Sequence, residues 1–506
     1  MSHLKNYCIT LGSVLLLGLL LISLEADVLY EAQNQNLFLH TPLFLEQQMM
    51  KAGGFLTWIG SYLTQYFFYP TLGTSILCLL WLFLIWLIHK AHPETWLPLA
   101  LLPIGCLLLT IVDMGYWVYY LKLPGHPFDT TVGAIVAIGL AAIYRSLPQR
   151  LAFTLPFTLI AVIIGYPAFG FYALWGTLLI GILAATKKQW TVTVVAAIGI
   201  VVVPLAAYHL LYHETNIAYI YWSALPMYSH NGQQFFAYYL PIIALVICTV
   251  GWCFISHPLS NRRWVLLGRC GAVLLFITGI IIGWNRNDNF HRELSMSHDM
   301  EQQQWEDMLT TAQHVKGEPT RAICLMKNIA LLRLGRDRKE MLTFPEGSKH
   351  PDAPFAIRMV HTIGKQVYLQ YGIPNYCYRW CMEDGVEYGW TVERLKLMTL
   401  CSLLNGEPTA ARRFTALLKK TTFHKDWAKK YEACTHNPKL VLGDEALSPI
   451  LPYLRDDNFL TSDQSQLELF LFEHLLGTPN NNRQQEELAQ RTMFYYRSNH
   501  QKLVEP

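Results

Sequence analysis

Long hydrophobic runs, separated by short polar breaks, fill the first half of the chain and stop near Trp284. A helix needs about 20 apolar residues to cross the hydrocarbon core of a bilayer, and about nine runs approach that length. They cover residues 7–24, 71–88, 96–112, 130–144, 151–166, 169–186, 190–211, 236–255 and 264–284. The pattern therefore predicts an all-α, polytopic transmembrane domain over residues 1–284.

Beyond this domain, apolar positions recur at helical spacing and charged residues are spread as on a water-soluble surface. We expect a second domain over residues 285–506. Gly372 and Gly406 are 34 positions apart, and Pro374 and Pro408 open matching segments. A period of 34 built from two helices is typical of tetratricopeptide (TPR) repeats, although the full consensus is not met. The second domain is thus predicted to be a TPR-like α-solenoid, whose concave surface suits binding of a protein partner.

Composition supports the membrane assignment, because 52% of the residues are hydrophobic and only 15% are charged. A soluble protein has about a quarter charged residues. The formal net charge of +3 gives no reason to expect a nucleic-acid partner. Basic residues gather in alternate loops that share one side: Lys5, Lys90, Arg145, Arg150, Lys187, Lys188, Arg262 and Arg263. The positive-inside rule then puts the N-terminus in the cytoplasm, and residues 25–70 and the whole second domain outside. A signal peptide cleaved after Ala26 is the alternative, which Leu24 disfavours because small residues are wanted there.

The first outer loop, residues 25–70, is too polar to cross a bilayer and too apolar to stay free of one. It holds a His-Thr-Pro turn at residues 40–42 and a Gly-Gly break at residues 53–54. Beyond the break, the large side chains recur at helical spacing and the hydroxyl residues fall elsewhere. The large ones are Phe55, Trp58, Ile59, Tyr62, Leu63, Tyr66 and Phe67; the hydroxyl ones are Thr57, Ser61 and Thr64. This predicts an amphipathic helix that lies on the membrane surface.

Carboxylates mark the outer ends of the first and third spans. Asp27, with Glu25 before it and Glu31 one helical turn after it, opens the first outer loop, and Asp113 closes the third span at a similar depth. A carboxylate in a partly dry site can have its pKa raised and then take a proton from an acceptor hydroxyl. We therefore expect Asp27 and Asp113 to be catalytic, with Glu25 and Glu31 binding substrate, against the alternative of solvated boundary residues.

Histidines and cysteines add weaker signals. His209, His213 and Glu214 cluster at the outer end of the seventh span, where the two histidines could form part of a metal site that lacks an evident third ligand. We take His213 and Glu214, with His40 of the turn, as candidate substrate-binding residues. Cys377 and Cys381 are one helical turn apart and are expected to be buried in the core, with a disulfide or redox role as the alternative.

The architecture resembles membrane-integral glycosyltransferases of the GT-C class. The resemblance rests on a first span that ends in outward carboxylates, a large first outer loop and an outer C-terminal domain. The His40-Thr41-Pro42-Leu43 run is similar to a His-Pro-Pro-Leu run of protein mannosyltransferases. The resemblance implies a polyprenyl-phosphate sugar as donor substrate, Asp27 as the base and Asp113 as an assisting acid. The sequence departs from the class in having Glu25-Ala26-Asp27 where many members have a paired Asp-Glu.

Most of the chain also resembles an uncharacterised family of polytopic proteins from Bacteroides-type bacteria. The segments that carry the resemblance are residues 53–54, 64–70, 327–331 and 421–431. It implies a multi-pass protein of a Gram-negative inner membrane, with the second domain in the periplasm, and it supplies no activity.

Two hypotheses of function follow. The first is a glycosyltransferase that moves a sugar from a polyprenyl-phosphate carrier to a periplasmic or envelope acceptor. The second is a non-enzymatic inner-membrane scaffold that presents the TPR-like surface to envelope proteins. Nine or so spans exceed the needs of an anchor and favour the enzyme. Membrane lipid and a lipid-linked sugar are the expected partners, no resident cofactor is expected, and a divalent metal stays open. No Gly-rich phosphate loop is present to bind a nucleotide.

Overall fold

A computed structural model describes residues 2–93, 97–120, 125–226, 234–254, 262–340 and 358–454, with residues 460, 467, 470 and 471. Within these residues the chain is helical and contains no strand. It divides into two compact units. Unit 1 comprises Met1–Gly115 and Leu121–Asn285, and unit 2 comprises Tyr116–Tyr120 and Arg286–Pro506. The inclusion of residues 116–120 in unit 2 has no signal in the hydrophobic pattern.

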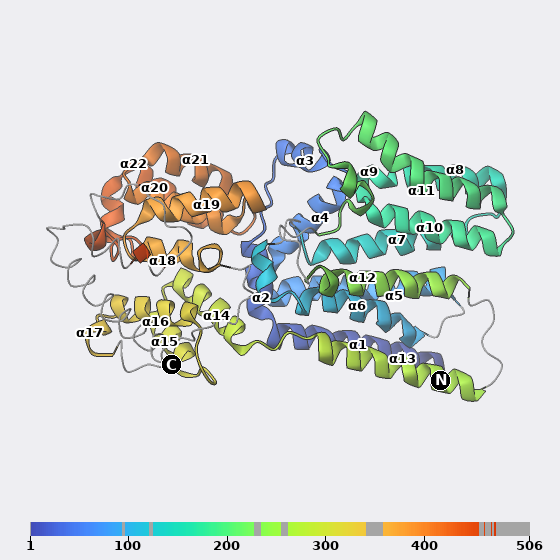
Figure 1. The fold of residues 1–506 in the computed structure, drawn as a ribbon, viewed down its shortest axis with the longest axis horizontal. Coiled ribbons are helices and arrows are strands. Elements are labelled where there is room, and N and C mark those ends of the chain that lie inside the picture. Colours follow the sequence, from blue (N-terminus) through green and yellow to red (C-terminus); the bar gives the residue numbers. More distant parts are fainter. Residues whose placement is uncertain are drawn as a thin grey trace, which may run out of the picture. The chain divides into compact units, whose positions relative to one another are not determined.

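The helices of unit 1 are drawn in blue to green in Figure 1. In chain order they are α1 (Ser2–Leu24), α2 (Ala26–Asn34), α3 (Pro42–Met49), α4 (Gly54–Thr64), η1 (Gln65–Phe68), α5 (Pro70–Ala91), η2 (Leu97–Ala100), α6 (Leu101–Val112), α7 (Phe128–Ser146), α8 (Leu151–Ile163), α9 (Gly165–Phe169), α10 (Phe171–Thr186), α11 (Trp190–Leu210), η4 (Ile217–Trp222), α12 (Gln234–Cys253) and α13 (Arg262–Gly283). Helices therefore form at every predicted hydrophobic run.

Four of these helices are long and apolar enough to cross a membrane: α1 from Asn6, α5, α7 and α11. The number rises to five if a bent helix pair counts as one span. The helices at residues 97–112, 151–163, 171–186 and 239–253 are apolar but shorter. The chain therefore has the character of a membrane-associated protein, and the count of nine spans stays a prediction.

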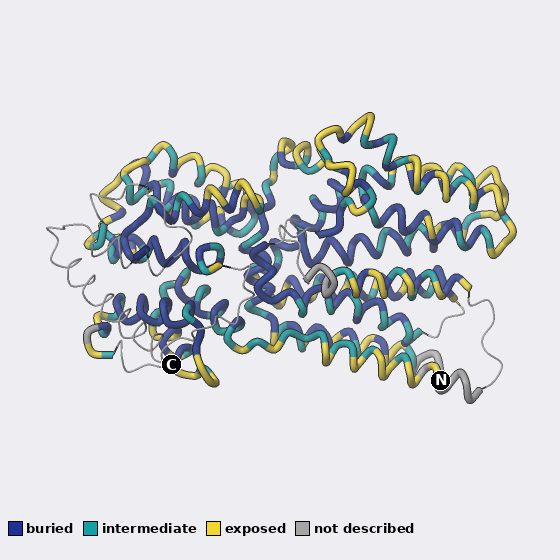
Figure 2. Tube along the Cα trace, in the orientation of Figure 1, coloured by how far each residue is buried: buried dark blue, intermediate teal, exposed yellow. Residues whose placement is uncertain are grey.

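The centre of unit 1 is formed by α7, which packs between α5 and α10. Trp81 of α5, Phe128 and Ile138 of α7, and Leu179 of α10 are fully buried there. By contrast, α1, α8, α11 and α13 carry many exposed apolar residues, and the exposed residues are yellow in Figure 2. Exposed apolar residues in such number are what a lipid environment covers.

The two faces of helix α4 are buried to different extents. Its small and hydroxyl residues, Gly60, Ser61 and Thr64, are buried, whereas Trp58 and Tyr62 are only half-buried. Gly60 approaches α7 closely, since a Cβ atom added there would lie 3.0 Å from the carbonyl oxygen of Gly125 and 3.2 Å from Cβ of Asp129. The face of α4 that carries the glycine and hydroxyl residues is thus in contact with the rest of the protein, and the aromatic face is more exposed.

The helices of unit 2 are η3 (Gly115–Tyr120), α14 (Asp288–Gln302), α15 (Trp305–Gln313), α16 (Arg321–Arg333), α17 (Asp337–Glu340), η5 (Met359–His361), α18 (Gly364–Gln370), α19 (Pro374–Tyr388), α20 (Val392–Leu404), α21 (Pro408–Leu418), α22 (Lys425–His436), η6 (Pro438–Gly443) and η7 (Leu451–Tyr453). Each of α18 to α22 packs against the next helix in the chain. The internal repetition in the sequence therefore corresponds to helices that pack one against the next in chain order, and a TPR solenoid stays a prediction.

The repeated glycines have a conformational role. Gly372 and Gly406 both adopt positive φ, at 76° and 71°, directly after a helix. The following residues, Ile373 and Glu407, donate their N–H groups to carbonyls five residues back. This is the Schellman helix end, which glycine adopts without steric cost. The hydrophobic pattern also predicts a further helix pair at residues 467–476 and 483–496 and an insertion at residues 344–354, and all of these except residues 467, 470 and 471 lie outside the described residues.

The close approach of α4 gives a first prediction. Gly60→Leu should destabilise unit 1 by roughly 1–3 kcal/mol, because the new side chain meets the backbone of Gly125 and the side chain of Asp129. Thermal unfolding of the detergent-solubilised protein measures the effect. Gly12→Leu on α1 is the matched control, since nothing lies within 4 Å of a Cβ added at Gly12. Equal unfolding midpoints for the two variants would contradict the tight contact.

Candidate functional site

The C-terminal end of α6 organises the polar residues of unit 1. The last carbonyl groups of a helix have no partner within the helix and must be satisfied from elsewhere. The Thr110 carbonyl lies 3.0 Å from Nε2 of His126, and the Val112 carbonyl accepts the N–H of Asn285 at 3.1 Å. The residue that ends the helix is Asp113. Segments far apart in sequence thus meet at one helix end.

Asp113 has the environment expected of a proton acceptor. Its carboxylate is half-buried and makes no side-chain hydrogen bond with any described residue. Burial raises the pKa of Asp113 to about 6, because removal from water disfavours the charged form. At neutral pH this carboxylate is ionised, yet it takes up a proton far more readily than an exposed aspartate.

Glu25 lies close to this helix end through α13. The side chain of Glu25 is 1% exposed and accepts a hydrogen bond of 2.6 Å from Nε1 of Trp284. The next residue, Asn285, binds the α6 end at Val112. The residues that follow α13 therefore connect Glu25 on one side with the end of α6, and hence Asp113, on the other.

The other two acids of the first outer loop lie on α2. Asp27 stands in its first turn, is partly exposed, and accepts the N–H of Val28 at 2.9 Å. Glu31 is buried and accepts a hydrogen bond of 2.8 Å from Nε2 of Gln35. Asp27 is accordingly the more accessible of the two.

A buried His-Asp pair is the main feature that sequence reasoning missed. Nδ1 of His126 lies 3.1 Å from Oδ1 of Asp129, and both side chains are almost fully buried, with Asp129 at 0% exposure. A carbonyl oxygen only accepts, so the contact with Thr110 requires a proton on Nε2 of His126. A second proton must then lie between Nδ1 and Oδ1. The signal in the sequence is the run Gly125-His126-Pro127-Phe128-Asp129, in which a histidine and an aspartate are three positions apart at the start of a predicted span.

The first outer loop covers this pair. Oγ1 of Thr64 donates to the His126 carbonyl at 3.5 Å, and Nδ2 of Asn36 donates to the Ser61 carbonyl at 2.9 Å. Gly125, at a φ of 95°, lets the two backbones approach, because a Cβ there would lie 2.5 Å from the Ser61 nitrogen. The face of α4 that carries the glycine and hydroxyl residues therefore covers the His126–Asp129 pair.

Buried polar atoms remain without partners near the pair. Among the described residues, Oδ2 of Asp129, the hydroxyl of Tyr172 and Oγ of Ser61 make no hydrogen bond. Tyr172 packs on Gly133, one helical turn beyond Asp129. Unsatisfied buried polar atoms are rare in native structures and concentrate at functional sites. The region beneath α4 is thus polar and suited to a hydroxyl-bearing group or to water.

The remaining predicted residues lie elsewhere on unit 1. His40 is exposed and packs edge-on against Phe38, with ring centroids 5.0 Å apart, just before Thr41 caps α3. His213 and Glu214 are exposed after α11, and neither makes a side-chain hydrogen bond or ion pair with a described residue. No group of three or more His, Cys, Asp or Glu side chains in the described part could hold a metal ion.

Comparison with known proteins identifies the family. The profile of a family described as "Family of unknown function (DUF6057)" matches residues 3–486, so the chain belongs to that family. No curated protein and no solved structure matches the chain. The family assignment agrees with the expected membership of an uncharacterised family and carries no activity.

The His126–Asp129 pair gives a second prediction. His126→Leu and Asp129→Leu should each cost about 3–5 kcal/mol, because each leaves a buried polar partner behind. The double variant should be less destabilised than the sum by roughly 0.5–3 kcal/mol. Denaturant or thermal unfolding in detergent measures the cycle. Asp426→Leu is a control at the same i,i+3 spacing, because the Asp426–Lys429 pair is exposed and contributes little. Strict additivity would show that the two side chains are uncoupled.

Proposed function

We propose that the protein is a membrane enzyme that transfers a glycosyl group from a polyprenyl-phosphate carrier to a hydroxyl acceptor on the outer side of the membrane. The observation that carries the proposal is Asp113, a half-buried carboxyl with a pKa of about 6 at the mouth of the helical bundle. A base of that strength, next to membrane lipid, matches the deprotonation of a hydroxyl during transfer from a lipid carrier.

The chemistry assigns distinct roles to the residues at the α6 end. Asp113 takes the proton of the acceptor hydroxyl as its oxygen forms a bond to the anomeric carbon. The bond from that carbon to the phosphate oxygen breaks, and the polyprenyl phosphate departs with the electron pair. Phosphate is a good leaving group, so no acid is needed on that side. Asp27, partly exposed on α2, is the second carboxylate of the proposal and orients the acceptor.

Three buried residues have a positioning role in this proposal. Glu25, fixed by Trp284, and the His126–Asp129 pair, fixed by Thr110, hold the elements that surround Asp113. Glu25, His126 and Asp129 are themselves buried, and burial of Asp113 at the same helix end raises the pKa of its carboxyl. GT-C-type architecture, a periplasmic acceptor and location in an inner membrane belong to the same proposal, and the family match leaves all of them open.

A scaffold is the second candidate, and one observation favours it. The helices α19 to α22 pack consecutively in unit 2, as helices do in repeat domains that bind proteins. In that case unit 1 is an anchor and the carboxylates at the α6 end serve only its structure. The two candidates differ in what happens when Asp113 loses its charge.

Asp113 gives the third prediction. Asp113→Asn should lower the transfer rate by about 10²-fold or more, because an amide cannot take the proton. Profiling of lipid-linked and envelope glycans by mass spectrometry should show loss of one glycan and accumulation of its lipid-linked donor, as in a deletion strain. Wild-type activity should fall as pH drops through about 6, since Asp113 is then protonated. Asp27→Asn should produce a similar loss.

Glu46→Gln is the matched control, because Glu46 is an exposed acid of the same loop, on α3. It should leave the glycans unchanged. If Asp113→Asn and Asp27→Asn both restore a deletion strain fully at normal protein level, the transferase proposal fails and the scaffold stands.

A further inference from the structure

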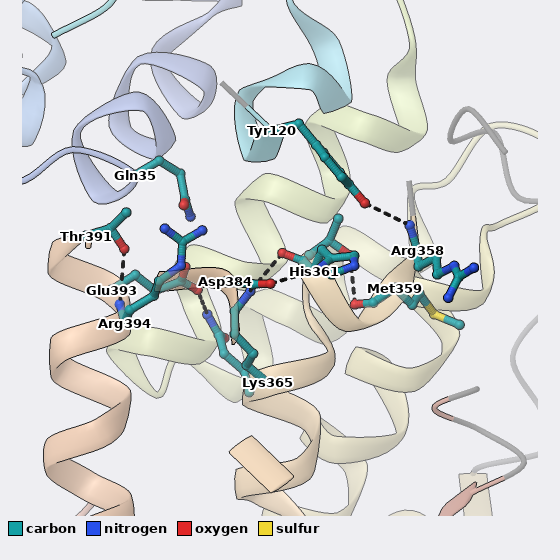
Figure 3. A network of polar contacts seen from close by, with 12 residues as sticks. Gln35, Tyr120, Arg358, Met359, His361, Lys365, Asp384, Thr391, Glu393 and Arg394 are labelled. Atoms are coloured by element: carbon teal, nitrogen blue, oxygen red, sulfur yellow. Dashed lines mark hydrogen bonds and ion pairs between the residues drawn. The ribbon is translucent and has the colours of Figure 1, made fainter. Parts of the chain in front are cut away.

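Unit 2 contains a polar cluster with the geometry of an oriented histidine. Oδ1 of Asp384 lies 2.7 Å from Nδ1 of His361, and its Oδ2 lies 2.8 Å from Nζ of Lys365. Figure 3 shows Asp384 between the two. The Lys365 ammonium also donates to the His361 carbonyl at 2.8 Å, which closes the cluster. The residues come from η5, α18 and α19.

The cluster fixes which nitrogen of His361 is available. Burial alone would raise the pKa of Asp384, but the Lys365 charge, the His361 hydrogen bond and the Arg394 charge outweigh it and lower that pKa to about 2. Asp384 is therefore a carboxylate and can only accept hydrogen bonds. Nδ1 of His361 must donate to it, and the lone pair of the neutral ring then resides on Nε2.

Aromatic rings hold the imidazole in place. The rings of Trp380, Tyr120 and Tyr388 meet His361 edge-on, at centroid distances of 5.4, 5.5 and 5.9 Å. The hydroxyl of Tyr120 in turn accepts the N–H of Arg358 at 3.3 Å, a contact drawn in Figure 3. The ring is thus restrained on several sides as well as at Nδ1.

His361 is the member of the cluster that reaches the surface. Its side chain is 17% exposed, against 1% for Asp384 and 0% for Lys365. A buried ion pair gives little net stability compared with apolar packing of the same volume. A structure that buries Lys365 and Asp384 behind a partly exposed imidazole therefore resembles the support of a ligand-contacting base more than a device for stability.

We propose that His361 is the centre of a ligand site on unit 2, in which Nε2 accepts a hydrogen bond from a hydroxyl group of a saccharide. Asp384 and Lys365 are its positioning residues. The site stands independently of the transfer chemistry proposed for unit 1.

The ligand class follows from the surroundings. The charges of Asp384 and Lys365 compensate each other, so a neutral ligand with O–H donors fits better than an ion. Tyr388 is half-buried beside His361, and Trp390 is 41% exposed with its ring lying on Gly385, the neighbour of Asp384. Exposed aromatic faces with a few fixed polar groups are characteristic of sites for small organic ligands. A polyol with apolar ring faces, such as a sugar, combines both requirements.

The experiment uses diethyl pyrocarbonate, which acylates neutral imidazole nitrogens, on the full-length protein in detergent. Mass spectrometry follows each histidine. His314, at the end of α15, is an internal reference, because it is exposed and its Nδ1 is also hydrogen-bonded, in this case to the carbonyl of Thr310 at 2.7 Å. His361 should react several-fold faster than His314 despite its lower exposure, and Asp384→Asn should reverse the order. Because the reference is in the same wild-type molecule, the first comparison needs no variant that folds.

Protection tests the ligand class. Maltotriose should slow the acylation of His361 several-fold and leave His314 unchanged, whereas trialanine, which offers peptide groups in place of hydroxyl groups, should protect neither. Slower reaction of His361 than of His314 in the wild-type protein overturns the site. Protection by trialanine, or no protection by maltotriose, overturns the saccharide assignment.

Discussion

The hydrogen bond from His126 to the Thr110 carbonyl is the contact on which the polar end of unit 1 depends. A helix end within an apolar bundle cannot leave its carbonyl groups without partners, because no water is present there to hydrogen-bond them. His126 supplies one partner and Asn285 supplies another. In doing so they bring the start of α7 and the end of α13 to the same place, and with them Asp129 and Glu25. Burial at this helix end raises the pKa of Asp113.

The two faces of helix α4 have different surroundings. Its glycine and hydroxyl residues permit a backbone approach to Gly125 that a larger side chain would prevent. Its aromatic residues, in contrast, form a row of rings on the other side. Trp58 stacks with Phe55 at 5.9 Å and with Tyr62 at 6.4 Å. The row ends shortly before α5, whose first residue is Pro70, so the aromatic face lies close to the start of a predicted span, where tyrosine and tryptophan are favoured.

Unit 2 combines helix ends that repeat along the chain with one buried ion pair that does not repeat. The glycines that end α18 and α20 repeat because each helix must reverse direction at the same point of its unit. The Lys365–Asp384 pair does not follow from that regularity. It joins α18 to α19, is buried, and lies behind the partly exposed ring of His361.

The sequence by itself determined where helices form and which of them are apolar, because both depend on local composition and on periodicity along one segment. It also located Asp27, Glu25 and Asp113 at the mouths of the predicted spans, since those positions follow from the ends of hydrophobic runs. It could not tell that Asp129 pairs with His126 beneath α4, or that Asp384 pairs with Lys365 and His361. The Asp384 cluster joins residues from three separate elements, and although His126 and Asp129 are close in sequence, the burial that sets the energetics of both clusters exists only when the helices pack. For the same reason the buried side of α4 was decided by its neighbour Gly125, and not by its own pattern of large and small residues.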